Sequence, residues 1–239
     1  NASYRYPKKG GYGYIGKRLT DKCKDRIKVG MEATRIDVYK KEIEFNHNEL
    51  VSFETILSSI PLPELVKIIP DAPQIVLDAA AKLKTNSMFV VNIGVKRPKI
   101  TDKNWIYYLE KEFSFVRVSF PFNQSESVTP LGASSISAEI AYGNDNPLPT
   151  NKENLSELVI TDLIKANILK ESDEIIYLNT VDIKYAYVIF DKERKASIKI
   201  IHEYLKKFDI IPFGRYGMWA YLWSDEAMLS GKKVSEKLS

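Results

Sequence analysis

The chain has 239 residues, of which 44% are hydrophobic and 28% are charged, as in an ordinary soluble globular protein. Its net charge of +4 is too weak to indicate nucleic-acid binding by itself, and it fits equally a pocket that holds an anionic ligand. A single cysteine, Cys23, excludes a disulfide within the chain, and only two histidines, His47 and His202, argue against a zinc site. The longest apolar stretch, residues 88–95, is far shorter than a membrane-spanning helix, and no signal peptide opens the chain. We therefore expect a cytoplasmic protein without a membrane span that binds neither nucleic acid nor metal.

The first residues are unusual in two ways. The chain opens with Asn1-Ala2 and no Met, which we interpret as the start of an excerpt from a longer protein. Four of the eleven glycines then fall within residues 10–16, where the backbone must turn sharply or approach another group closely. The dinucleotide fingerprint GxGxxG is absent here. The segment is either a tight surface turn or a loop that lies against a flat ligand or a phosphate, with Lys8 and Lys9 nearby.

The first third of the chain predicts short elements in quick succession. Polar residues with helical spacing are followed by alternating apolar residues on either side of a turn at Lys40-Lys41. A buried strand ends at Pro61, and prolines then stand near the starts of two helices. The predicted elements are a helix at 17–25, strands at 36–38, 43–45 and 55–60, and helices at 63–69 and 72–84.

From Ser87 onward, β-rich segments separated by Pro, Gly, Asn and Asp predominate. The predicted strands are 87–95, 105–109, 113–120, 134–142, 175–189 and 210–213, with helices at 151–167, 195–207 and 225–237 and a turn at 214–217. This order predicts an α+β fold with a mostly antiparallel or mixed sheet and flanking helices.

The segment from Gly214 to Asp225 is the clearest candidate for a binding site. It combines two glycines, Arg215 and four aromatic residues directly before a predicted helix. Backbone N–H groups at a helix start can hold an anion, and arginine can pair with phosphate through two hydrogen bonds. The alternative is an aromatic cap on the hydrophobic core.

Two strands carry further candidates. Strand alternation places Arg117 on the same side as Phe113 and Phe115, where a charge needs a partner, either an acid such as Glu139 or a ligand phosphate. Tyr187 and its neighbouring tyrosine at 185 are either edges of the core or rings that stack on a ligand. Neither histidine nor Cys23 lies in a pattern typical of a nucleophile or an acid–base pair.

These segments, taken in order, resemble a known family. They are Tyr6-Pro7 with Gly10-Gly11-x-Gly13, residues 57–62 (LSSIPL), residues 91–95 (VNIGV), residues 105–107 (WIY), Phe115-x-Arg117-Val118-x-Phe120 and Gly214-Arg215-Tyr216-Gly217-x-Trp219-x-Tyr221. The chain resembles, nearly end to end, the C-terminal part of UDP-galactopyranose mutase-like flavoproteins of the amine oxidase and protoporphyrinogen oxidase superfamily. The last of these motifs is the most specific.

The resemblance implies a non-covalent FAD, whose phosphates would sit on a GxGxxG loop that this sequence does not show. It implies a sheet domain for the substrate together with the C-terminal remainder of a Rossmann-like FAD-binding domain. The corresponding segments would be 1–60 and 206–239 for the flavin and 61–205 for the substrate. The residues implied as flavin contacts are Gly10, Gly11 and Gly13 beside the ring, Ala33 at the adenine end, and Gly214, Arg215, Tyr216, Gly217 and Asp225 at the C-terminal contact.

The resemblance also implies a substrate and a mechanism. Arg117 is similar to the arginine that binds the substrate diphosphate, and Tyr187 and Tyr221 are similar to tyrosines of the nucleotide-sugar pocket. Trp223 and Ser224 depart from the family pattern at the sugar end. In the mutases the reduced flavin does the covalent work, so no catalytic residue is expected from this chain. The implied role is surface-polysaccharide synthesis.

Two alternatives stay open. One is a FAD-dependent oxidoreductase of the amine or protoporphyrinogen type. The other is a non-catalytic module that binds a nucleotide or a protein through exposed aromatic residues near Trp219 and Trp223. Exposure of the same aromatic face would allow a homodimer.

Overall fold

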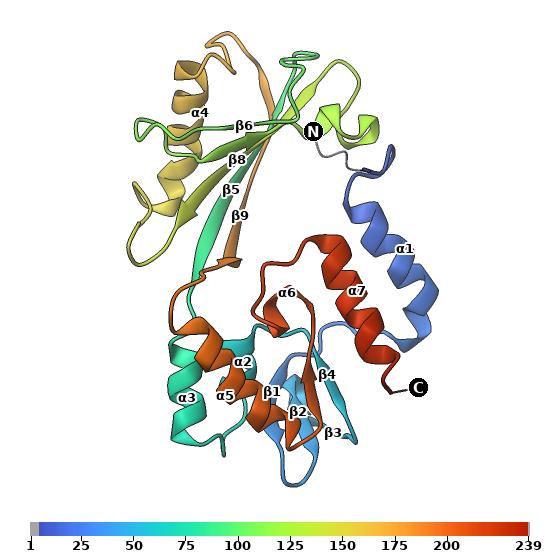
Figure 1. Cartoon of the computed structure of the whole chain (residues 1–239). Helices are drawn as coiled ribbons and strands as arrows, with labels where there is room; N and C mark the ends of the chain where they lie inside the picture. Colours follow the sequence, from blue (N-terminus) through green and yellow to red (C-terminus); the bar gives the residue numbers. More distant parts are fainter. Residues whose placement is uncertain (1–4, 239) are drawn as a thin grey trace. The chain divides into compact units, whose positions relative to one another are not determined.

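The computed structural model describes residues 5–238, apart from the side chains of His47 and Glu126, so the Asn1-Ala2 start lies outside the described residues. The chain forms two compact units (Figure 1). Unit 1 comprises Asn1–Ile27 and Ser87–Lys184, and unit 2 comprises Lys28–Asn86 and Tyr185–Ser239. The functional segments 1–60, 61–205 and 206–239 remain predictions.

Unit 1 is built on a five-stranded sheet in the order β6-β7-β8-β5-β9. Strands β6, β7, β8 and β5 pair antiparallel, with Arg117 opposite Glu139 and Asn92 opposite Ser137. The strand bounds are β5 Thr85–Val95, β6 Trp105–Tyr107, β7 Arg117–Ser119, β8 Ser134–Tyr142 and β9 Ile175–Val188.

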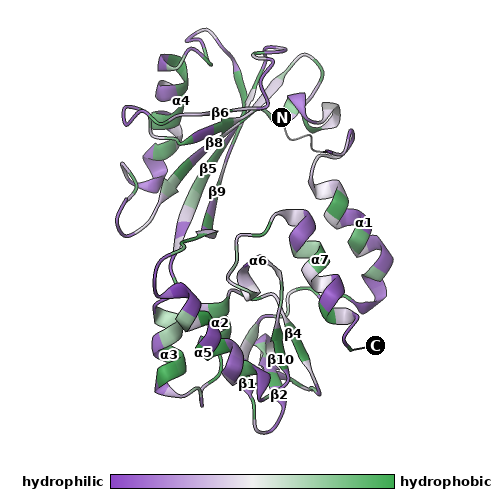
Figure 2. Cartoon of the chain, viewed as in Figure 1, coloured by the Kyte–Doolittle hydropathy of each residue, from purple (hydrophilic) through white to green (hydrophobic). Residues whose placement is uncertain are grey.

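Helix α4 (Leu155–Lys165) covers one face of this sheet, and it carries both hydrophobic and hydrophilic residues (Figures 1 and 2). Its fully buried Leu155, Val159 and Leu163 recur at the helical period and share one core with alternate residues of β5 and β8. Because side chains alternate along a strand, the intervening residues of β8, from Ser135 to Glu139, lie on the opposite face. Unit 1 therefore has one apolar sheet face under α4 and one polar face.

The remaining elements of unit 1 are short helices around the sheet. Helix α1 begins inside the glycine-rich segment that the sequence predicted as a loop, and none of its residues is buried. The bounds are α1 Gly13–Cys23 and the 3₁₀ turns η1 Lys24–Arg26, η3 Pro121–Asn123, η4 Glu126–Val128 and η5 Lys152–Asn154.

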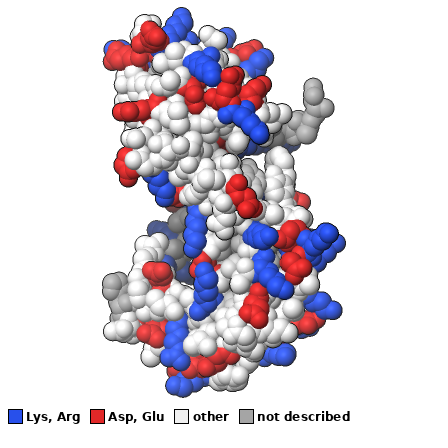
Figure 3. All heavy atoms as spheres, turned by 90° about the vertical axis from the view of Figure 1, so that its left-hand side faces the viewer, with Lys and Arg blue, Asp and Glu red and all other residues white. Residues whose placement is uncertain are grey.

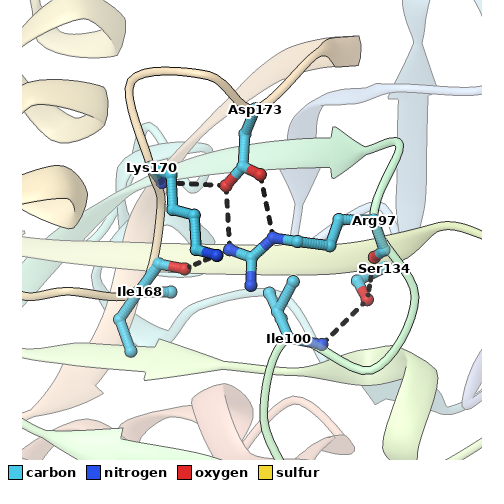
Figure 4. Close-up of polar contacts among 6 residues, drawn as sticks. All are labelled: Arg97, Ile100, Ser134, Ile168, Lys170 and Asp173. Atoms are coloured by element: carbon cyan, nitrogen blue, oxygen red, sulfur yellow. Dashed lines mark hydrogen bonds and ion pairs between the residues drawn. The ribbon is translucent and has the colours of Figure 1, made fainter.

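An ion pair fastens one end of the sheet of unit 1 (Figure 4). The Arg97 side chain donates to both carboxylate oxygens of Asp173, each at 2.8 Å, and to the Ile168 carbonyl at 2.8 Å. Asp173 also accepts from the Lys170 N–H, and the Ser134 hydroxyl donates to the Arg97 carbonyl at 2.7 Å. These bonds join the segment after β5, the start of β8 and the segment before β9.

Unit 2 contains two small sheets. An antiparallel meander has the order β1-β2-β3, and a parallel pair joins β4 to β10. Helices α2, α3 and α5 contribute to one core with these strands, and α3 packs on α5. The bounds are β1 Ala33–Asp37, β2 Glu42–Phe45, η2 Asn46–Asn48, β3 Glu49–Ser52, β4 Ile56–Ser58, α2 Leu62–Lys67, α3 Gln74–Ala81, α5 Arg194–Lys206, β10 Ile210–Pro212, α6 Gly214–Gly217 and α7 Ser224–Ser235.

The two tryptophans of the 214–225 segment differ in burial, and Trp219 agrees with the alternative prediction of an aromatic cap on the hydrophobic core. Trp219 is fully buried in the core of unit 2, whereas Trp223 is 66% exposed. Trp219 has a positive φ of 49°, and its carbonyl accepts hydrogen bonds from Nε and Nη2 of Arg194. The prediction that Trp219 belongs to an exposed aromatic face is therefore wrong, because the reversed backbone turns its ring into the core.

The structure confirms the predicted α+β fold. One predicted strand, 113–120, is shortened to Arg117–Ser119, because residues 111–116 form a turn and bends. Strand alternation therefore does not extend back to Phe115. Val118 is buried in the core, so Arg117 lies on the opposite, polar face rather than beside Phe115.

The surface shows no segregation of charge on the face drawn in Figure 3, where basic and acidic side chains are interspersed. Among residues 5–238, no helix is both long and apolar enough to cross a membrane.

Candidate functional site

Arg215 lies in α6, directly after β10 in unit 2. Gly214, with φ of 72°, reverses the chain between the two elements. Gly217 then lies so close to Ser58 of β4 that no side chain fits between them. The two glycines thus allow α6 to lie flat against the end of the β4–β10 pair, and the Arg215 side chain is carried on this turn.

The Arg215 guanidinium is held by backbone carbonyls. Nη1 donates to the Leu222 carbonyl at 3.1 Å, and Nη2 donates to the Ala186 carbonyl at 3.3 Å. The Ala186 carbonyl also accepts from the Tyr216 hydroxyl at 3.1 Å. The side chain is therefore oriented by neutral groups from the end of β9 and from the segment after α6.

Tyrosine rings surround the same guanidinium. Its carbon lies 5.0 Å from the ring centroid of Tyr187, 4.8 Å from that of Tyr221 and 5.8 Å from that of Tyr216. Tyr187 and Tyr221 stack on each other at 5.8 Å with 19° between their planes. We call Tyr187, Arg215, Tyr216 and Tyr221 the arginine–tyrosine cluster. It brings together four of the residues that the sequence predicted for flavin or substrate.

No acid among the described residues forms an ion pair with the guanidinium of this cluster. Among the described residues Arg215 forms no ion pair, and its Nε is buried without a hydrogen-bond partner. A partly buried cation with only neutral partners favours an anionic ligand. Burial raises the pKa of Tyr216, against a smaller lowering by Arg215, so this hydroxyl stays a neutral donor near neutral pH.

Arg117 forms a separate group on the polar sheet face of unit 1. Its Nη2 donates to Glu139 Oε1 at 2.6 Å, and its guanidinium carbon lies 5.9 Å from the ring centroid of Tyr107. The sequence left two possible partners for Arg117, an acid such as Glu139 or a ligand phosphate. In the structure Arg117 is paired with Glu139. The role of Arg117 toward a substrate diphosphate stays a prediction, as does that of each predicted site residue.

The glycine segment contacts the turn η4 rather than projecting freely. The Gly11 N–H donates to Ser125 Oγ at 3.2 Å, and the Gly10 N–H donates to Ser127 Oγ at 2.5 Å. Gly13 is the exposed first residue of α1. The segment is therefore a docked turn.

The other predicted flavin contacts lie apart from the arginine–tyrosine cluster in the chain. Ala33 is the first residue of β1, opposite Phe45 at an irregular point of the ladder. Asp225 is an exposed acid in the first turn of α7. Nothing in their surroundings assigns a ligand to them.

Of the reactive side chains that the structure describes, neither His202 nor Cys23 belongs to an alternative centre. Burial lowers the pKa of His202, although a hydrogen bond with the Gly217 backbone opposes this effect. Cys23 is exposed. Within the part of the chain that the structure describes, no group of three His, Cys, Asp or Glu side chains could hold a metal ion.

Sequence reasoning missed two kinds of contact. The carbonyls of Ala186 and Leu222 have no sequence signal, because any residue supplies a carbonyl. The polar face of β8 could have been found from the sequence, because Ser135, Ser137 and Glu139 alternate with apolar residues.

Comparison with known proteins gives the fold context. No protein-family model matches the chain. Reduced UDP-galactopyranose mutase has a TM-score of 0.83 and 26% identity, over 90% of this chain and 47% of that one. A protoporphyrinogen oxidase-like protein from Exiguobacterium sp. 255-15 has a TM-score of 0.71 and 15% identity, over 93% and 50% of the two chains. A CLA-producing fatty acid isomerase from P. acnes has a TM-score of 0.66 and 10% identity, over 95% and 52%.

The chain therefore spans about half the length of each of these structures. The two matches at 15% and 10% identity show the fold alone. Together the matches confirm the resemblance predicted from the motifs, because the chain has the fold of part of a protein of this superfamily.

Proposed function

We propose, from the fold that this chain shares with UDP-galactopyranose mutase and protoporphyrinogen oxidase-like proteins, that it is the C-terminal part of a FAD-dependent enzyme acting on a nucleotide sugar. We infer the nucleotide-sugar substrate from the mutase, because its sequence identity to this chain is the highest of the three structures compared. A role in surface-polysaccharide synthesis in the cytoplasm belongs to the same proposal.

The observation that carries the proposal is the uncompensated charge of Arg215. Its guanidinium contacts two backbone carbonyls and three tyrosine rings, and no acid among the described residues. A flat, conjugated ring system with an adjoining anionic chain matches both features, since the tyrosines can stack on the ring and the guanidinium can pair with negative charge. The cluster therefore fits a flavin dinucleotide.

The residues that would hold the flavin are Arg215 and Tyr216, on a turn that Gly214 and Gly217 make possible. When bound, FAD would supply electron transfer or the reactivity of its reduced ring, and no residue of this chain is assigned that chemistry. The chain's own share is to bind and orient the ligands, through the Arg215 guanidinium and the hydroxyls of Tyr187 and Tyr221.

The first test is the visible absorption spectrum of protein made from the complete open reading frame, after desalting. We expect the absorption bands of oxidised flavin. The variant Arg215→Gln should lose flavin during desalting while Arg35→Gln, at a half-exposed arginine of unit 2, should retain it. Circular dichroism shows whether each variant is folded, and Arg215→Lys, which keeps the charge, should retain part of the flavin.

Two other results would change the conclusion. A folded, colourless protein that takes up no added FAD contradicts the proposal and favours a non-catalytic binding module. A yellow protein that does not interconvert UDP-galactopyranose and its furanose form under reducing conditions favours the second candidate, a FAD-dependent oxidoreductase. The fold shared with the protoporphyrinogen oxidase-like protein supports that candidate.

A further inference from the structure

Arg194, the first residue of α5, contacts the chain directly after α6 in unit 2. Its Nε donates to the Trp219 carbonyl at 2.9 Å, and its Nη2 donates to the same oxygen. Hydrogen bonds from a charged donor are stronger than those between neutral groups, so this carbonyl is firmly held. The contact lies outside the arginine–tyrosine cluster, and Arg194 was not predicted from the sequence as a residue for flavin or substrate.

The Arg194 side chain is itself held in place without an acid. Its guanidinium carbon lies 4.0 Å from the ring centroid of Phe190, and its backbone N–H donates to Asp191 Oδ1 at 3.0 Å. Burial lowers the pKa of Arg194, and no carboxylate among the described residues forms an ion pair with its guanidinium. The positive charge is therefore directed to the Trp219 carbonyl and the Phe190 ring.

Trp219 occupies a backbone conformation that needs such support. Its φ of 49° lies in the left-handed region, which costs free energy for a residue with a large side chain. Its ring is fully buried in the core of unit 2 and is not free to follow a change of the backbone. The hydrogen bonds from Arg194 therefore stabilise a conformation that Trp219 would otherwise disfavour.

The chain after Trp219 folds back on α6. The Ala220 N–H donates to the Arg215 carbonyl at 2.9 Å, and the Leu222 N–H donates to the Ala220 carbonyl at 3.1 Å. Both bonds span short stretches of backbone, so the direction of residues 220–222 depends on the conformation of Trp219. A change at the Trp219 peptide would therefore move these residues relative to α6.

Residues 220–222 supply two contacts of the arginine–tyrosine cluster. The Leu222 carbonyl accepts from Arg215 Nη1 at 3.1 Å, and the Tyr221 ring centroid lies 4.8 Å from the Arg215 guanidinium carbon. The Tyr221 ring also stacks on that of Tyr187. One hydrogen-bond acceptor and one ring around Arg215 thus stand two and three residues after the carbonyl that Arg194 holds.

From this series of contacts we infer that Arg194 is a positioning residue for the arginine–tyrosine cluster. By fixing the Trp219 carbonyl it places the Leu222 carbonyl and the Tyr221 ring around Arg215, and so sets how tightly the cluster holds an anionic ligand. The inference rests on the proposed function for the identity of that ligand, a flavin dinucleotide, and adds to it a residue outside the cluster.

The first readout needs no flavin. Arg194→Met removes the donors and the charge but keeps an unbranched side chain, and both residues are good helix formers, so α5 is not weakened. Protein from the complete open reading frame is labelled with 3-fluorotyrosine, and Tyr187→Phe and Tyr221→Phe assign the two resonances in the fluorine NMR spectrum. We expect both resonances to move toward those of exposed tyrosines in Arg194→Met, because the two rings no longer stack.

The second readout is the affinity of the same protein, freed of flavin, for added FAD. Arg194→Met should weaken it about tenfold or more, which corresponds to about 1.4 kcal/mol. Arg194→Lys, which keeps the charge and one donor group, should restore part of the affinity and part of the resonance positions. Lys195→Met makes the same kind of change at the exposed next residue of α5 and should alter neither readout. Circular dichroism and urea unfolding show that each variant is folded under these conditions.

Three results would overturn the inference. One is a folded Arg194→Met variant that keeps the resonances of residues 187 and 221 in place, and the second is such a variant with unchanged FAD affinity. The third is an equal effect of Lys195→Met, since the cause would then be the charge of α5 rather than the contact with Trp219. If the unchanged protein takes up no FAD, the proposed function fails. The resonances alone then decide whether Arg194 positions Tyr221: a shift supports the inference, and its absence overturns it.

Discussion

Gly217 packs directly on the backbone of Ser58, so that a Cβ at position 217 would lie 2.6 Å from the Ser58 carbonyl oxygen. The same carbonyl accepts the Phe213 N–H at 2.9 Å and cannot move away without breaking that bond. Gly217→Ala should therefore destabilise unit 2 by about 1–3 kcal/mol, as overpacking of a tight contact does. Because α6 also carries Arg215, the variant should lose flavin in the desalting experiment.

Gly16→Ala is the matched control for this substitution. Gly16 also lies in a helix, α1, but nothing lies within 4 Å of a Cβ built there. Alanine in an exposed helix interior is favoured over glycine by about 0.5–1 kcal/mol, so this variant should be as stable as the unchanged protein or more stable. Urea unfolding of both variants makes the comparison, and equal midpoints would show that the Gly217 contact relaxes without cost.

The ion pair of Arg117 and Glu139 predicts a measurable coupling. Their side chains are 28% and 14% exposed, so removal of one partner leaves a largely buried charge. We expect Arg117→Gln and Glu139→Gln each to destabilise the chain by about 1–3 kcal/mol, with a coupling of about 0.5–3 kcal/mol in a double-mutant cycle.

The pair Asp102 and Lys103 provides the comparison, because its side chains are 75% and 63% exposed. An exposed pair contributes about 0–1 kcal/mol, so the same cycle there should give little coupling. If the two cycles give equal values, Arg117 is not held by Glu139 in solution and is available to a ligand.

Much of the architecture could be predicted from local pattern. The strand at 134–142 and a helix within 151–167 were predicted from β-rich composition and helical spacing, and both lie in the structure where they were expected. Gly214 and Gly217 were identified because they occur with Arg215 and four aromatic residues before a predicted helix, and the structure gives one a positive φ and the other a close backbone contact. These features are local in the chain.

The errors have a common physical origin in contacts between distant segments. Trp219 is buried because Arg194, 25 residues away, fixes its carbonyl in a reversed backbone. The glycine segment is docked through hydroxyls more than 110 residues away, at Ser125 and Ser127. The pocket of about 510 Å³ in unit 1 likewise combines residues of β5, β8 and β9, which no single window of sequence reports.

Asp173 predicts how stability changes at acid pH. Its hydrogen bonds with Arg97 lower the pKa of this carboxyl, against the opposing effect of burial. Since the pKa is lower in the folded state, the contribution to stability is fully present above the unfolded value of about 3.9 and is lost as pH falls through the folded pKa. Asp173→Asn should therefore be less stable than the unchanged protein at pH 7, and the difference should shrink toward pH 3.

Thermal unfolding between pH 3 and pH 7 measures this difference. Glu174→Gln is the neighbouring control, because the Lys96–Glu174 pair is more than 60% exposed on both sides and should contribute little at any pH. The stability difference between Asp173→Asn and the unchanged protein could instead stay constant from pH 3 to pH 7. That result would show that the carboxylate charge of Asp173 does not stabilise the segment before β9.

The exposed side chains after α6 predict self-association of the chain. Trp223 is 66% exposed and Tyr221 is 48% exposed, with Met218 nearby in sequence at 37%. Exposed apolar residues in such a group mark interaction surfaces more often than isolated ones do. We expect the average mass from light scattering to rise with concentration toward that of a dimer. Trp223→Glu should suppress the rise by placing a charge at the interface, whereas Leu131→Glu, at a fully exposed residue of unit 1, should not. A monomer mass at every concentration would contradict the prediction, and suppression by both variants would place the effect in net charge rather than in this surface.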